Sequence, residues 1–94
     1  MPTFLVSYDL RGTDDTSENY KKLIAKIKSY SSWAKITYSD WMVVTTKKAA
    51  DVRDELWTYM HKDDRLLVAK VGAPAAWKGT IPDDVSDWMK KNLN

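Results

Sequence analysis

The order of its apolar segments restricts this 94-residue chain to few folds. Runs rich in β-branched and aromatic residues predict strands over residues 3–9, 33–38, 41–46 and 65–71. Apolar residues at helical spacing predict helices over residues 16–29 and 48–60, and a last helix from residue 80 onwards. This order predicts an α+β fold on the ferredoxin-like plan, βαββαβ, in which two helices cover a four-stranded antiparallel sheet and an extra C-terminal helix follows.

Polar residues stand where the helices are expected to begin. Asp15 or Thr16 is placed to cap the first helix, and Thr45 or Thr46 lies near the cap of the second. Thr80 precedes the last helix, with an acid three residues on and a proline in the first turn. Each of these side chains is predicted to accept hydrogen bonds from the first backbone N–H groups of its helix.

Composition predicts one domain, residues 1–94, and excludes several kinds of site. The chain has no cysteine, which excludes disulfides and thiolate chemistry, and its single histidine, His61, excludes a multi-histidine zinc site within one chain. A net charge of +2 permits an anionic partner without requiring one. Because no apolar run approaches the ~20 residues of a membrane span and no signal pattern opens the chain, we expect a cytoplasmic protein without a membrane segment.

The two longest predicted strands are apolar on both faces. Phe4-Leu5-Val6 and Leu66-Leu67-Val68-Ala69 do not alternate with polar residues, as strands with one solvated face do. A second layer must therefore cover the face that the two helices leave open. Either the last helix or a second copy of the chain can provide that layer, and we expect a homodimer.

Asp9 ends the first strand, where the sheet opens to solvent. A metal site for phosphodiester chemistry needs hard oxygen ligands and open coordination positions, and a twofold axis would bring two copies of Asp9 together around one Mg²⁺ or Mn²⁺. Alternatively, Asp9 caps the strand end and accepts hydrogen bonds from the following turn. Asp9 is thus the candidate metal ligand and catalytic residue.

Basic and aromatic side chains provide candidates for binding nucleic acid or a nucleotide. Arg11 follows Asp9 closely and can clamp a phosphate with two parallel hydrogen bonds. The other candidate phosphate-binding residues are Lys22, Lys26 and Lys78, and the candidate base-stacking residues are Trp33, Trp41 and Trp77. The alternatives are a solvated helix face for the lysines and, for Trp77, packing on the last helix or a partner subunit.

These pieces in this order resemble a known group of proteins. They comprise a strand ending Tyr8-Asp9-Leu10, a capped helix, the hairpin from Trp33 to Thr46, Leu66-Leu67-Val68, Trp77 with Gly79, and the closing Trp88-Met89-Lys90-Lys91-Asn92-Leu93. Together they resemble the small ferredoxin-fold proteins of the CRISPR adaptation machinery, the Cas-two family, with the related VapD-type ribonucleases. The stand-alone SinR-like proteins are the most similar branch.

The resemblance implies a homodimer whose first strands lie near the twofold axis. In nuclease members of that family the paired acids at the strand ends are proposed to hold Mg²⁺ or Mn²⁺, and Asp9 is the residue that carries over. The loop that follows, Arg11-Gly12-Thr13-Asp14-Asp15, departs from the pattern because it is acidic. We therefore expect a homodimer that binds nucleic acid or a nucleotide, with metal-dependent cleavage by Asp9 as one hypothesis. The alternatives are a noncatalytic dimer that sequesters a nucleotide and a structural subunit that docks another protein.

Overall fold

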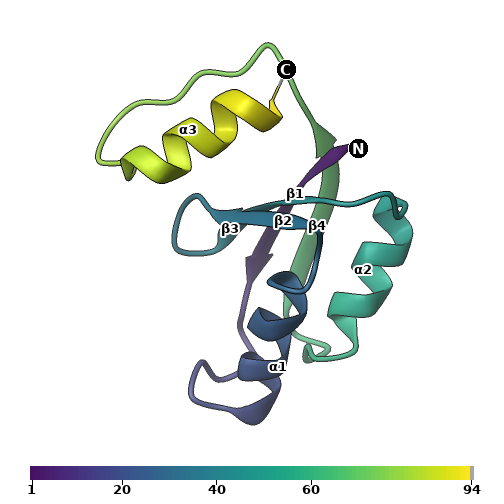
Figure 1. Cartoon of the computed structure of the whole chain (residues 1–94). Coiled ribbons are helices and arrows are strands. Elements are labelled where there is room, and N and C mark those ends of the chain that lie inside the picture. The colour runs from purple at the N-terminus through teal and green to yellow at the C-terminus, as the bar shows by residue number, and fades with distance from the viewer. Residues whose placement is uncertain (94) are drawn as a thin grey trace.

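The computed structural model describes residues 1–93 as one antiparallel sheet with three helices (Figure 1). The elements are β1 (Thr3–Asp9), α1 (Glu18–Ile27), β2 (Ser32–Lys35), β3 (Asp40–Val44), α2 (Ala49–Trp57), β4 (Arg65–Val71) and α3 (Asp83–Asn92). The strand order is β2-β3-β1-β4, so β1 is central and pairs antiparallel with both β3 and β4. The α+β, ferredoxin-like prediction with an extra C-terminal helix is confirmed.

One face of the sheet forms the core with α1 and α2. Alternate residues of β1, namely Phe4, Val6 and Tyr8, are buried in a cluster that includes Leu23 of α1 and Leu56 of α2. The two-residue period of a strand places these three β1 side chains on the same face. The intervening residues of β1, up to Asp9, consequently point to the opposite face.

The N-cap of the first helix lies one or two residues later than predicted. Ser17 is the N-cap residue, and its hydroxyl accepts a hydrogen bond from the Tyr20 backbone N–H at 3.1 Å. The prediction of Asp15 or Thr16 as the cap was wrong, because Asp14 instead bonds the Thr16 backbone and hydroxyl and turns the chain ahead of the helix. This turn places Ser17 at the helix start.

The hairpin and the later helix starts also differ from prediction. β2 ends at Lys35, and the backbone N–H groups of Ile36 and Thr37 both donate to the carbonyl of Asp40, which closes a longer turn than the predicted Ser39-Asp40 pair. At α2 and α3 the N-cap positions are Lys48 and Pro82, and neither makes a side-chain cap hydrogen bond. The capping roles predicted for Thr45, Thr46 and Thr80 are therefore wrong.

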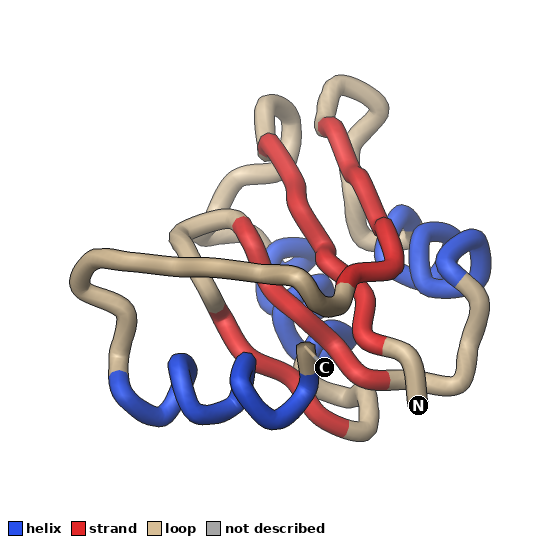
Figure 2. The backbone as a smooth tube through the Cα atoms, turned by 90° about the horizontal axis from the view of Figure 1, so that it is seen from above, coloured by secondary structure: helices blue, strands red, loops and turns tan. Residues whose placement is uncertain are grey.

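The last helix covers part of the second sheet face. α3 lies on the opposite side of the sheet from α1 and α2, at the end of a long loop (Figure 2). The Trp88 indole N–H donates to the Ser32 hydroxyl at 2.8 Å, and the Thr3 hydroxyl donates to the Asn92 carbonyl at 3.0 Å. Met89 is buried here. The cover is incomplete, since Leu67 on β4 keeps 56% of its surface exposed.

The packing of α3 can be tested through Met89, which is 2% exposed. Met89→Ala removes most of a buried side chain and is expected to lower the free energy of unfolding by about 2–4 kcal/mol. Chemical denaturation measures this, with the exposed Lys90→Ala on the same helix as control. Equal stability of the two variants would show that α3 does not pack on the sheet.

Candidate functional site

Asp9 at the end of β1 is paired with a guanidinium. The Arg11 Nε–H donates to the Asp9 carboxylate at 2.9 Å, and both side chains are more than half exposed. Arg65 is the residue directly opposite Asp9 in the β1–β4 register, so its side chain shares that face of the sheet. Two arginines therefore lie near Asp9, and of these the sequence predicted a role only for Arg11.

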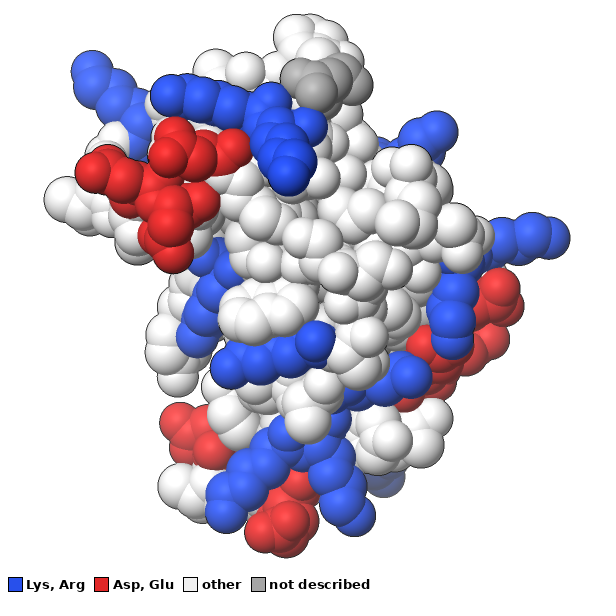
Figure 3. Space-filling view, viewed as in Figure 1, with Lys and Arg blue, Asp and Glu red and all other residues white. Residues whose placement is uncertain are grey.

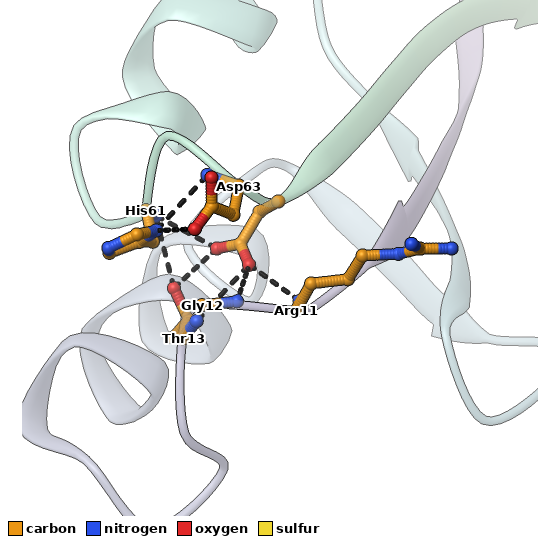
Figure 4. Close-up of polar contacts among 6 residues, drawn as sticks. Arg11, Gly12, Thr13, His61 and Asp63 are labelled. Atoms are coloured by element: carbon orange, nitrogen blue, oxygen red, sulfur yellow. Dashed lines mark hydrogen bonds and ion pairs between the residues drawn. The ribbon is translucent and has the colours of Figure 1, made fainter.

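The loop after β1 is held by the carboxylate of Asp64 (Figure 4). The backbone N–H groups of Arg11, Gly12 and Thr13 donate to its Oδ1 at 2.8, 2.7 and 3.1 Å. Its Oδ2 accepts from the Thr13 hydroxyl and from the His61 backbone N–H. Burial alone would raise the pKa of Asp64, but the hydrogen bonds from Thr13, Gly12 and His61 outweigh it and hold the pKa well below its usual value.

His61 packs directly against Gly12. A Cβ built on Gly12 would lie 2.1 Å from the His61 Nδ1, which leaves no room for any other residue unless the imidazole moves. That Nδ1 also accepts the Asp63 backbone N–H at 3.1 Å. The Arg11 side chain points away from this cluster (Figure 4), so the pinned loop directs it toward Asp9.

A cleft of about 420 Å³ opens beside Asp9. Its lining residues are Tyr8, Asp9, Leu10, Thr13, Asp14, Asp15, Tyr20, Tyr38 and Ser39. The predicted metal needs several oxygen ligands, but no three His, Asp or Glu side chains in residues 1–93 are arranged to hold one ion. The predicted Mg²⁺ or Mn²⁺ site joins the Asp9 of two copies of the chain, and it stays a prediction.

A second hollow, of about 460 Å³, lies between α1 and the β2–β3 hairpin. We call it the aromatic groove; it is lined by Tyr20, Lys21, Ile24, Ala25, Lys28, Lys35 and Trp41. Figure 3 shows Lys and Arg as the prevalent charges over this region of the molecule, whereas a group of acids stands over the start of α3. Tyr20 lines both hollows, so the aromatic groove adjoins the cleft at Asp9.

Two tryptophans stand at the edge of the aromatic groove. The ring centroids of Trp33 and Trp41 are 5.7 Å apart at an interplanar angle of 54°. Trp41 is buried and its indole N–H donates to the Tyr8 hydroxyl at 3.0 Å, whereas Trp33 is 38% exposed. Of these two of the three predicted stacking residues, only Trp33 offers an open surface to a base, and Trp41 packs against it.

Two lysine ammonium groups lie over these rings. Lys28 Nζ is 5.2 Å from the centroid of the Trp33 ring, and Lys35 Nζ is 5.4 Å from the centroids of both the Tyr38 and Trp41 rings. Such contacts are favourable cation–π interactions. Lys28 and Lys35 were not among the predicted phosphate-binding residues: Lys28 reaches Trp33 only because the end of α1 lies beside the hairpin, and Lys35 reaches Trp41 through the β2–β3 register.

The predicted phosphate-binding lysines lie elsewhere. Lys26 forms an ion pair with Glu55 at 3.4 Å, in a contact between α1 and α2. Glu55 also accepts from Lys47 and from the Tyr30 hydroxyl, and these contacts lower its pKa, with the Lys47 hydrogen bond contributing most. The structure thus uses the charge of Lys26 to join two helices.

Lys22, Lys78 and Trp77 are not brought together. Lys22 is exposed on α1, and Lys78 is exposed in the loop between β4 and α3. Trp77 packs on α3, where its indole N–H donates to the Ser86 hydroxyl at 3.0 Å. This packing corresponds to one of the alternatives considered for Trp77 from sequence.

Comparison with known proteins supports the fold. No protein-family model matches the chain, and no curated protein matches it. A crystal structure of a hypothetical protein from Thermus thermophilus is similar, with a TM-score of 0.66 and 23% identity over 86% of this chain and 94% of that one. At this identity the similarity shows the fold alone, and membership of the Cas-two family stays a prediction. Within residues 1–93 no helix is long and apolar enough to cross a membrane.

The role of Asp64 can be tested by Asp64→Asn. Loss of the buried charged acceptor is expected to lower the free energy of unfolding by about 2 kcal/mol at neutral pH. Urea denaturation measures the change, and Asp63→Asn at the exposed neighbouring carboxylate serves as control, with an expected change below about 0.5 kcal/mol.

The stabilisation that Asp64 provides is expected to depend on pH, and the Asp64→Asn variant tests this as well. The folded-state pKa of Asp64 lies below the unfolded value of about 3.9, so its stabilisation is complete above about pH 4 and is lost as the pH falls toward the folded-state pKa. The stability difference between the parent protein and Asp64→Asn should therefore narrow below about pH 4. A constant difference would contradict the ionised, hydrogen-bonded state of this carboxylate.

Proposed function

We propose that this chain is a homodimeric nucleic-acid- or nucleotide-binding protein and that the aromatic groove is its binding surface. The observation that carries the proposal is that two lysines lining the groove, Lys28 and Lys35, place their ammonium groups over the exposed rings of Trp33 and Tyr38 beside it. Phosphates attract the ammonium groups, and bases stack on the rings. A solvated lysine face would not need aromatic rings beneath the charges.

The homodimer is supported by the part of the sheet that α3 leaves uncovered. Leu67 is exposed, and Leu5, Met42, Ala69 and Val71 beside it on the same face are only partly buried. These apolar side chains form a continuous surface, which a second copy of the chain would cover. Asp9 and Arg65 stand on that same face, at its polar end.

Metal-dependent cleavage at Asp9 is a second candidate function. It is favoured by the position of the cleft, which meets the aromatic groove at Tyr20. A strand bound in the groove could therefore reach Asp9. Two copies of Asp9 from a dimer would supply the carboxylates that hold Mg²⁺ or Mn²⁺, and Arg11 would be free to bind phosphate once the metal occupies the carboxylates. Without cleavage, the same surface would sequester a nucleotide.

Binding in the aromatic groove is tested by the double variant Lys28→Gln/Lys35→Gln. We expect affinity for oligonucleotides to fall by about tenfold near 0.1 M salt. For a single strand, the slope of log K against log salt should decrease in magnitude by about 1.4, at about 0.7 for each lost phosphate contact. Fluorescence anisotropy with labelled RNA, DNA and a nucleoside triphosphate measures both.

The matched control is Lys62→Gln/Lys70→Gln, which removes the same charge from exposed positions outside the groove. Equal losses in the two double variants would mean that net charge alone governs binding and would remove the groove from the proposal. Absence of binding to every probe would overturn the proposed function itself.

Cleavage is tested by Asp9→Asn. The variant should abolish Mg²⁺- or Mn²⁺-dependent cleavage of labelled RNA or DNA, while affinity is kept or increased because Arg11 loses its ion-pair partner. Asp87→Asn, at an exposed acid of α3, is the control. Native mass spectrometry of the same samples reports the oligomeric state; a monomer would remove the paired-carboxylate site, and cleavage unaffected by Asp9→Asn would remove the catalytic role.

A further inference from the structure

A partly exposed ring that is held firmly in place adjoins the aromatic groove: Trp33 is not among its lining residues, but it packs on Trp41, which is. Trp33 lies on β2, an edge strand, and packs on the buried ring of Trp41 at 5.7 Å. Trp41 is in turn fixed by its hydrogen bond to Tyr8 of the central strand. A ring supported in this way presents a rigid flat surface at little cost in conformational entropy.

One ammonium group lies over this ring and a second lies over the neighbouring rings. Lys28 reaches Trp33 from the end of α1, and Lys35 reaches Tyr38 and Trp41 from the end of β2. Both side chains have flexible four-carbon stems. When another flat group stacks on the Trp33 ring in place of Lys28, the Lys28 ammonium can move to a neighbouring anion without backbone movement.

We propose that the aromatic groove selects single-stranded nucleic acid, with one unpaired base stacked on Trp33 and the flanking phosphates on Lys28 and Lys35. This inference rests on the proposed function and names the substrate class of the same site. In a duplex, both faces of each base are covered by neighbouring bases, so an indole reaches only a base that is free of the stack. A hollow of about 460 Å³ is a size suited to small ligands, such as one nucleotide unit.

The lining of the groove indicates that binding tolerates many sequences. Arg, Asn and Gln, whose planar groups read base edges with paired hydrogen bonds, do not occur among the described residues that line it, and the lysines that do line it are point charges on flexible stems. The contacts that remain are stacking and charge, which every base and phosphate can make. We therefore expect similar affinity for single strands of different sequence.

The experiment compares one oligonucleotide of about a dozen nucleotides as a single strand and as a duplex, by fluorescence anisotropy. Trp33→Ala is expected to weaken single-strand binding by about tenfold, because the stacked base loses its ring. Trp33→Phe keeps a ring on which the base can stack, so its effect should be smaller. Trp57→Ala is the matched control, since Trp57 is 40% exposed, as Trp33 is 38% exposed, but it lies on α2 and not on the β2–β3 hairpin beside the groove. Circular dichroism confirms that each variant is folded.

The possible results separate this inference from the proposed function. Tighter binding of the single strand, lost in Trp33→Ala and kept in Trp57→Ala, supports the inference. Equal binding of the duplex, or no effect of Trp33→Ala while Lys28→Gln/Lys35→Gln still weakens binding, overturns it and leaves the proposed function standing. If neither strand form nor a mononucleotide binds, the proposed function fails and the inference fails with it.

Discussion

The five hydrogen bonds to the carboxylate of Asp64 fix the part of the molecule on which the candidate site depends. They join the loop that leaves the central strand to the turn that enters β4, more than 50 residues later. Thr13 contributes both to this cluster and to the wall of the cleft, and Arg11 leaves the same loop toward Asp9. An ionised acid that is buried yet fully hydrogen-bonded thus determines where the charges at the end of β1 stand.

The sequence predicted the fold well because hydrophobic periodicity is a local property. The first and last strands, residues 3–9 and 65–71, were predicted with the bounds that the structure has. Helix starts were less predictable, since several polar residues precede each helix and the choice depends on the whole turn. Asp14 took Thr16 as its hydrogen-bond partner and left the cap to Ser17, which the pattern of residue types does not reveal.

Site residues were harder to predict because they depend on contacts between distant segments. From the sequence, Lys26 was predicted to bind phosphate at the surface, but in the folded chain α2 places Glu55 within ion-pair distance of it. Lys28 and Lys35 are unremarkable in sequence and gain their position from tryptophans on the hairpin. One local clue was available. Trp33 and Lys35 are two residues apart on one short strand, which places an aromatic and a basic side chain on the same face.

Tyr20 lines both hollows, so a ligand that fixes or moves its ring from one side would alter the wall of the other. A ligand that orders this ring from one side has already met part of the entropic cost of ordering it from the other. Linkage then requires that each ligand change the affinity for the other by the same factor. An ion or small molecule in the acidic cleft would in this way regulate the neighbouring groove without touching any of its lysines.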